Sequence, residues 1–339
     1  MLQTFKGRWL PRICASLPFG VWHRISGISL VVPHWHVVSD LELPHVSGLY
    51  RFRNIREFKA DLEFLLRYYM PVTEQEVVCH LYDAHPLPRR CVLFTFDDGF
   101  REIHDVVAPL LRAKGVPAIF FLITSAIDNL ILCAPQKKSL LIKALTRPQS
   151  AATLDEAARL LSLGGTSTSA ALASRIRAVS YHQRHVLDDL GRVLECDFQG
   201  YLASQRPYLT SEQVKSLVQQ GFAVGAHSVD HPVYAELSMD EQLYQTRESM
   251  HWLSERFHFN CQSFAFPYRD SGVTLDFFQE MFAEGELKLC FGTGGLIPHA
   301  FPYNLPRFST ERTDLTAAEV LAVQFGRSLL RWKLGIRSK

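Results

Sequence analysis

Two adjacent carboxylates, Asp97 and Asp98, follow an apolar run at residues 92–96 and precede Gly99. A run of this length that is rich in Val, Phe and Thr predicts a strand buried on both faces, and the glycine permits a sharp exit from it. Both carboxylates then lie at the carboxyl end of a strand, which is where parallel α/β folds place their sites. A bound cation stabilises such neighbouring negative charges. The motif alone also fits a solvated Asp-Asp turn.

Two histidines four residues apart, His227 and His231, follow a second short apolar stretch at residues 221–224. Imidazole nitrogens placed in this way can converge on one metal ion. Taken alone, the pair is equally typical of capping or surface histidines. Together with Asp98 it forms a set of two imidazoles and one carboxylate, which leaves a coordination position for water.

The elements around these residues alternate between strand and helix. Strand, helix and strand over residues 92–123 indicate a parallel βαβ unit. Capping boxes at Thr210 and Ser238 predict the starts of two later helices. A third apolar stretch, residues 263–266, runs into a turn at Pro267. By itself this stretch is an ordinary strand followed by a proline turn.

The order and spacing of the three stretches resemble the motifs of the polysaccharide deacetylase family, the NodB-homology carbohydrate esterases. The resemblance covers residues 28–128 and 207–310. The matching motifs are Thr95-Phe96-Asp97-Asp98-Gly99, His227-Ser228-Val229-Asp230-His231-Pro232 and Phe266-Pro267-Tyr268. The resemblance implies an α/β fold, a distorted (β/α) barrel of about seven strands, to which this chain adds a helical insertion.

The same resemblance implies a hydrolase, a metal-dependent deacetylase that removes the N-acetyl group of an amino sugar in a polysaccharide, oligosaccharide or glycolipid. Asp98, His227 and His231 would bind a divalent metal, with Zn²⁺ as the expected ion. Asp97 would be the general base. Tyr268 would help to hold the oxyanion through its backbone N–H and, with Pro267, would contact the substrate. Ser228 would steady the loop that carries the two histidines.

The sequence departs from the family pattern in two places. The arginine that often stands two residues before the proline is replaced by Ala265, and Arg307 or Arg269 can supply that charge. Arg307 and His36 are also candidate contacts for the substrate. The late Leu-x-His motif, whose histidine protonates the leaving amine, is not evident. His299 lies in the corresponding late region and is one candidate for this acid.

His36 is the other candidate, because Trp35-His36 follows the first strand much as a Tyr-His pair often does in the family. A structural histidine at a strand end is an equal alternative. Two further functions stay open for the whole chain. One is a carbohydrate-binding relative that has lost turnover, and the other is an O-acetyl esterase with the same site.

The motifs and composition divide the chain into segments. Residues 1–27 form a basic lead-in, residues 28–314 the barrel, and residues 129–206 the helical insertion, which is a lid, a substrate platform or a cover for apolar surface. Residues 315–339 are expected to form a basic amphipathic helix. Both basic ends suit either the protein's own surface or peripheral contact with an anionic membrane.

The composition limits the classes of function. With 339 residues, 47% hydrophobic and 21% charged, the chain has the profile of a soluble globular protein. Its net charge of +2 gives no electrostatic case for nucleic acid. No apolar stretch reaches about 18 residues, and seven unpatterned cysteines suit a reducing compartment. We therefore expect a cytoplasmic protein, including one at the inner membrane surface, in preference to a secreted one.

Overall fold

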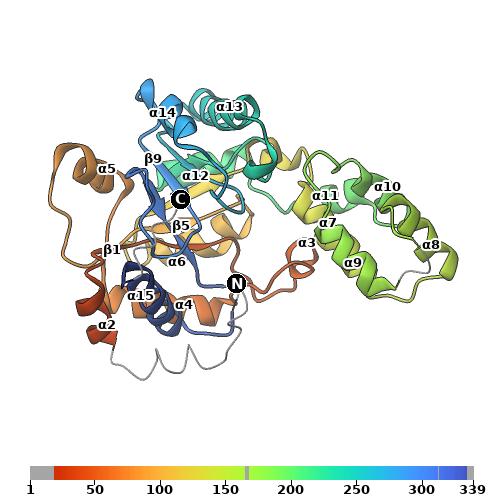
Figure 1. Ribbon diagram of the computed structural model, residues 1–339, viewed down its shortest axis with the longest axis horizontal. Coiled ribbons are helices and arrows are strands. Elements are labelled where there is room, and N and C mark those ends of the chain that lie inside the picture. Colours follow the sequence, from red (N-terminus) through yellow and green to blue (C-terminus); the bar gives the residue numbers. More distant parts are fainter. Residues whose placement is uncertain (1–18, 165–167, 312, 334–339) are drawn as a thin grey trace.

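The computed structural model describes residues 19–164, 168–311 and 313–333 (Figure 1). At its centre lies a parallel sheet of eight strands in the order β10-β9-β8-β7-β6-β5-β2-β11. The strands are β2 (Pro33–Trp35), β5 (Phe94–Phe96), β6 (Ala118–Leu122), β7 (Ala223–Ala226), β8 (Ser263–Ala265), β9 (Leu289–Gly292), β10 (Asn304–Pro306) and β11 (Phe308–Ser309).

The sheet curls into a nearly closed barrel because one segment borders both of its edges. β10 pairs with β9, and β11 pairs with β2. Only Arg307 separates β10 from β11. The predicted α/β barrel is confirmed, with eight strands where about seven were expected, since Arg307 divides the last segment in two.

A second, three-stranded parallel sheet extends the amino end of the barrel. It consists of β1 (Leu30–Val31), β4 (Cys91–Val92) and β3 (Met70–Pro71). β1 and β4 each run, after one intervening residue, into barrel strands β2 and β5. The chain therefore passes from the second sheet into the barrel at Val32 and at Leu93.

Helices cover the barrel, and several of them start at local capping signals. Side-chain capping boxes begin α12 at Thr210 and α13 at Ser238, as predicted. The α-helices outside the insertion are α2 (Phe19–Ser26), α3 (Pro44–Ser47), α4 (Ile55–Tyr68), α5 (Glu74–Asp83), α6 (Ala108–Arg112), α12 (Ser211–Gln219), α13 (Met239–Phe257), α14 (Leu275–Ala283) and α15 (Ala317–Lys333). Shorter helical turns are η1 (Ile103–Val107, a π-helix), η2 (Thr124–Asn129) and η3 (Tyr234–Glu236).

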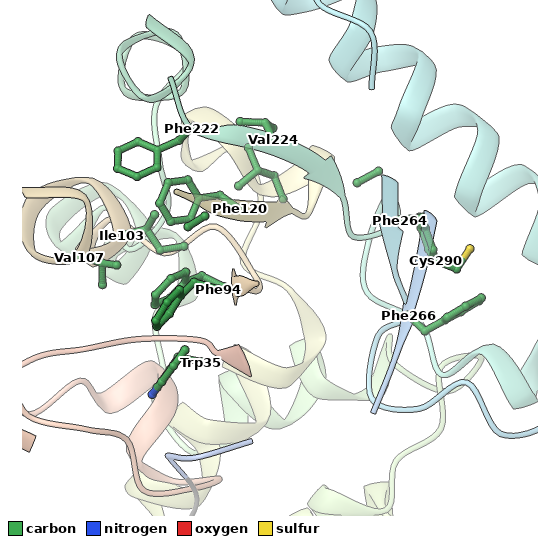
Figure 2. Packing of buried hydrophobic residues seen from close by; sticks show 14 of the residues in the cluster. Trp35, Phe94, Ile103, Val107, Phe120, Phe222, Val224, Phe264, Phe266 and Cys290 are labelled. Carbon is green, nitrogen blue, oxygen red and sulfur yellow. The ribbon is translucent and has the colours of Figure 1, made fainter. Parts of the chain in front are cut away.

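The strands are buried on both faces, which explains why their sequences are almost uninterruptedly apolar. Trp35 stacks on Phe94 and Phe96 in a cluster between the sheet and its helices (Figure 2). Phe121 and Phe291 belong to a separate cluster that uses the alternate residues of the same strands. Burying each such side chain contributes roughly 1.5–3 kcal/mol, so both clusters hold the strand ends in fixed positions.

Five helices between β6 and β7 extend from the barrel as an arm, seen at the right of Figure 1. They are α7 (Ala134–Ala144), α8 (Ala151–Leu160), α9 (Ser169–Arg177), α10 (Val186–Val193) and α11 (Phe198–Gln205). The arm has its own core, in which Leu141, Leu172 and Leu187 are buried. The arm corresponds to the helical insertion that the sequence predicted over residues 129–206.

The two basic ends are described only in part. Residues 1–18 and 334–339 lie outside the described residues, and so do the lead-in's Lys6, Arg8 and Arg12. The C-terminal helix is described as α15, which packs against α2 and α4. Within the described ranges, no helix combines the length and the apolar character needed to cross a bilayer.

Candidate metal centre and active site

The carboxyl ends of the barrel strands open into a cleft of about 720 Å³. Asp97 and Asp98 line it from the end of β5, and His227 and His231 line it from the end of β7. All four side chains are buried. The fold therefore brings together two motifs that are separated by more than a hundred residues in the sequence.

Asp98 is held toward the two histidines by an unusual backbone turn. Asp98 and Gly99 have φ values of 73° and 74°, a region that glycine tolerates and most other residues avoid. Asp98 Oδ1 lies 3.4 Å from His227 Nε2 and 3.2 Å from His231 Nε2. Tetrahedral ligands with bonds of about 2.0–2.1 Å would lie about 3.3–3.4 Å apart. The spacing of these three atoms fits one small divalent ion.

The tautomer of His227 supports the same conclusion. Its Nδ1 lies 2.8 Å from the carbonyl oxygen of Ala265, and since a carbonyl can only accept, Nδ1 carries the hydrogen. In the neutral imidazole, Nε2 then presents a lone pair to the carboxylate of Asp98. Two facing electron pairs repel each other unless a cation lies between them. Asp98 Oδ1 and His227 Nε2 are also buried, and neither has a hydrogen-bond partner among the described residues.

The loop that carries His231 is fixed by hydrogen bonds from its neighbours. The backbone N–H of His231 donates to Ser228 Oγ at 3.0 Å, the role that the resemblance implied for Ser228. Ser125, beyond β6, donates its hydroxyl to the Val229 carbonyl at 2.6 Å. Both Ser228 and His231 have positive φ values, 67° and 63°. These bonds stabilise a strained loop that aims two imidazoles at one point.

The charges of this cluster are those that metal binding requires. Burial alone would raise the pKa of Asp98, but the neighbouring His231 and His227 outweigh it and hold that pKa well below its usual value. Burial lowers the pKa of His231, which favours its neutral, ligating form. An ionised Asp98 and a neutral His231 are the forms in which these side chains bind Zn²⁺.

Asp97 points to a different partner, the guanidinium of Arg307. Arg307 donates two parallel bonds to the two oxygens of Asp97, at 2.7 and 2.8 Å. Burial would raise the pKa of Asp97, but Arg307 and His227 overcome it and depress that pKa strongly. Of the two arginines that the sequence offered as a replacement at Ala265, Arg307 is the one that pairs with Asp97.

Arg307 is itself fixed on all sides. It is completely buried, donates to the Gly292 carbonyl at 3.3 Å, and lies against the rings of Phe121 and Phe291. Because Arg307 separates β10 from β11, the residue that closes the barrel also orients Asp97. The sequence had suggested a substrate contact for Arg307; the structure places its side chain on the carboxylate instead.

His36 lies in the cleft and is held by a carboxylate that the sequence did not single out. Its Nδ1 hydrogen-bonds one oxygen of Glu311, and its backbone N–H donates to the other at 2.9 Å. Glu311 is completely buried just beyond β11. Its place after a strand end was the signal in the sequence that could have identified it. His34, two residues earlier in β2, also lines the cleft.

Of the other predicted residues, Tyr268 and Arg269 line the cleft, whereas His299 does not. Pro267 is buried, and the half-exposed ring of Tyr268 stands edge-on to His231, 4.7 Å between ring centroids, where it lines the cleft with Arg269. His299 is not among the lining residues; it packs on Phe278 of α14. The structure therefore does not bring His299 to the site, because the chain after β9 turns outward over α14.

The arm contributes one wall of the cleft and a support for the histidine loop. Lys138 and Arg177 line the cleft from α7 and α9. Tyr181 donates its hydroxyl to both oxygens of Asp230 at 2.9 Å, and Gln245 of α13 donates to the same carboxylate at 2.9 Å. Asp230 immediately precedes His231, so the arm is connected directly to the loop that carries both histidines.

The chain thus has a parallel α/β barrel with a carboxylate–imidazole cluster at the carboxyl ends of its strands, which is where barrel enzymes place their active sites. The sequence model described as polysaccharide deacetylase matches residues 84–277, more than half of the chain. The chain belongs to the polysaccharide deacetylase family, and this confirms the resemblance of its motifs. Polysaccharide deacetylases are hydrolases that cleave the amide bonds of N-acetyl groups.

Individual relatives match over shorter stretches. The chain is 28% identical over 116 residues to the putative polysaccharide deacetylase YxkH of Bacillus subtilis, which covers 34% of each protein. It is 31% identical over 102 residues to the poly-β-1,6-N-acetyl-D-glucosamine N-deacetylase of Escherichia coli, which covers 28% of this chain and 14% of that protein. These alignments span about a third or less of the curated relatives.

Solved structures resemble the chain over most of its length. The Streptococcus pyogenes deacetylase PplD, in complex with acetate, has a TM-score of 0.57 at 16% identity and covers 88% of this chain and 99% of its own. IcaB from Ammonifex degensii has a TM-score of 0.54 at 19% identity, with 88% and 97% covered. At these identities the likeness shows the shared fold.

Proposed function

We propose that this protein is a metal-dependent deacetylase that hydrolyses the N-acetyl group of an amino sugar in a polysaccharide, oligosaccharide or glycolipid. The observation that carries the proposal is the placement of Asp98 Oδ1 at 3.4 and 3.2 Å from two imidazole nitrogens, beside a carboxylate held by an arginine. Asp98, His227 and His231 would hold the ion. A divalent ion at this position supplies an acidified water and polarises the acetyl carbonyl.

Asp97 serves as the general base. The bidentate pair with Arg307 keeps its carboxylate ionised and fixes its direction, so an oxygen stays available to accept a proton. A strongly ionised carboxylate is a weak base, and it therefore suits a water whose own pKa has been lowered. The backbone N–H of Tyr268, at the turn after Pro267, is the donor that we assign to the oxyanion.

His36 serves as the general acid. Its Nδ1 bond to Glu311 fixes the ring and stabilises the protonated form that must donate to the leaving amine. The arrangement resembles the pairing of Asp97 with Arg307, and the two pairs follow the neighbouring strands β2 and β5. Both catalytic groups are thus oriented by a buried, oppositely charged partner that does not itself touch the substrate.

A sugar polymer or a shorter glycan fits the site as substrate. The cleft is lined by hydroxyl, amide and charged groups, which include Gln136, Lys138 and Thr293, and by the ring of Tyr268. One of the relatives above carries the name poly-β-1,6-N-acetyl-D-glucosamine N-deacetylase. This suggests N-acetylglucosamine polymers as the first substrates to test.

The test is acetate release from N-acetylglucosamine oligomers and glycolipids, measured with the metal-loaded protein and with its Asp97→Asn variant. We expect one metal ion per chain and acetate release that is abolished in the variant, although the metal stays bound. Metal binding without acetate release from any N-acetylated glycan would contradict the proposal. Release of acetate only from O-acetylated sugars would replace it with an esterase.

A further inference from the structure

A broad groove of about 1260 Å³ lies at the amino end of the barrel. Its walls come from α2, the end of α4, β3 and the residues that lead into β4. The catalytic cleft opens at the carboxyl ends of the strands, so the groove and the cleft occupy opposite ends of the barrel. The groove has no part in the chemistry proposed above.

Four arginines line this groove: Arg24, Arg67, Arg89 and Arg90. All four are exposed, and the described residues that line the groove include no aspartate or glutamate. None of the four takes part in an ion pair within the described part of the chain. Since exposed arginines commonly find an acidic neighbour on a protein of near-neutral net charge, four unpaired ones around a single groove form a local positive field.

Exposed apolar side chains lie beside these arginines. Met70, which lines the groove, is 59% exposed, and Val21 and Ile25, on the same short helix as Arg24, are 39% and 54% exposed. Val21 and Ile25 are four residues apart and share one face of α2. The other face is used differently, because Trp22 packs against the core and α15. The apolar face of α2 is therefore presented to the solvent.

We infer that this groove, with Val21, Ile25 and Met70 at its rim, docks the protein on a membrane surface that contains anionic phospholipids. Phosphate groups match the four guanidinium groups in charge and in geometry. A soluble polyanion would also match the charges, but it would gain nothing from the exposed apolar side chains. Arginines combined with partly inserted apolar side chains are the composition of an interfacial surface.

The experiment is flotation of the full chain with vesicles of phosphatidylglycerol and phosphatidylcholine, compared with vesicles of phosphatidylcholine alone, over a range of NaCl concentrations. We expect binding to the anionic vesicles that weakens as salt rises. Each arginine near an anionic bilayer contributes roughly fivefold to partitioning, so R67Q/R89Q/R90Q should bind on the order of a hundredfold more weakly.

A matched control variant distinguishes the effect of the groove's arginines from the effect of the protein's net charge. R147Q/R159Q/R206Q removes the same number of exposed arginines from the arm, far along the chain from the groove, and should bind as the wild type does. Unchanged thermal unfolding would show that both triple variants fold. Equal loss in the two variants, no loss in R67Q/R89Q/R90Q, or no vesicle binding by the wild type would overturn the proposal.

A second variant tests the apolar rim. V21S/I25S keeps every charge and should still bind at low salt, but should dissociate at a lower NaCl concentration than the wild type. Identical salt profiles for this variant and the wild type would contradict insertion of apolar side chains. Arginine-dependent binding to a soluble acidic polysaccharide, without vesicle binding, would replace the membrane with an acidic glycan as the partner.

Discussion

At the scale of single residues, the site is built from pairs in which a buried partner sets the charge of a catalytic group. Arg307 holds Asp97 through two short bonds, and Glu311 holds His36. All four side chains are buried, so each pair keeps its electrostatic strength. The loss of either member of a pair should therefore affect both activity and folding.

Arg307→Gln should lower the free energy of unfolding by about 3–5 kcal/mol at neutral pH, because it leaves the buried Asp97 carboxylate uncompensated. Arg307 depresses the folded-state pKa of Asp97, so its stabilisation is present above the unfolded-state pKa and is lost as pH falls through the folded-state value. The difference in free energy of unfolding between Arg307→Gln and the wild type should therefore become smaller at acidic pH. Urea unfolding at several pH values measures it.

The double variant D97N/R307Q provides the control, since it removes the buried charge together with its partner. It should recover part of the lost stability, while remaining inactive. If Arg307→Gln alone were as stable as the wild type at neutral pH, the ion pair would not hold Asp97 in the charged form.

His36→Gln should lower kcat by about 10²–10⁴-fold on an N-acetyl sugar, because the leaving amine would lose its proton donor. An aryl acetate, whose leaving group departs without protonation, should be hydrolysed nearly as fast as by the wild type. Steady-state rates on both substrates provide the measurement. His299→Gln, which alters a residue outside the cleft, should retain activity on both.

At the scale of elements, the loop of residues 227–231 depends on segments that lie far away in the sequence. β6 contributes Ser125 after its carboxyl end, α13 contributes Gln245, and the arm contributes Tyr181. The last two converge on Asp230. Outer partners of this kind fix the orientation of the ligands and so tune the affinity for a metal.

Tyr181→Phe should weaken metal affinity by roughly 10–100-fold, because Asp230 loses the hydroxyl that holds it beside His231. Competition with a chromogenic chelator measures the dissociation constant. Tyr201→Phe removes a hydroxyl from the same arm, where it bonds His45, and should leave the affinity unchanged. Equal affinities for Tyr181→Phe and the wild type would mean that the arm does not support the loop.

At the scale of the whole molecule, one closed barrel joins the catalytic cleft to the groove at its other end. The segment that contains Arg307 closes the sheet and also reaches the cleft. A ligand that ties strand ends together should therefore stabilise the entire barrel. The three candidate metal ligands come from two of these ends.

Zinc should raise the free energy of unfolding by about 2.7 kcal/mol at a free concentration a hundredfold above its dissociation constant. A chelator should remove that gain together with the activity, and returned zinc should restore both. Thermal unfolding with and without zinc provides the measurement. The H227A/H231A variant should show no such shift, and a shift of the usual size would contradict the assigned ligands.

Two further groups of possible ligands lie among the described residues: His34, His36 and Asp97 inside the cleft, and a cluster of Cys79, Asp83 and His85 at the carboxyl end of α5, outside it. The members of the cluster on α5 are mostly exposed. If zinc still stabilised the double histidine variant, this cluster would be the first place to examine.

The sequence by itself determined the family and the barrel, and it predicted the residues that the fold brings together in the cleft. Apolar runs that end in Asp97-Asp98 and before His227 are local patterns, and parallel strands necessarily bring such ends to one edge. The capping boxes at Thr210 and Ser238 are also local, since they depend on residues three positions apart. These features could be read without knowledge of how the barrel closes.

Only the tertiary structure decided which distant residues support the site. In the structure Arg307 binds Asp97, and Glu311 binds His36. His299 packs on α14 outside the cleft, and the arm contacts Asp230 through Tyr181. Each of these contacts joins segments that are tens to hundreds of residues apart. Their partners are chosen by barrel closure and side-chain packing, which no local pattern of residue types records.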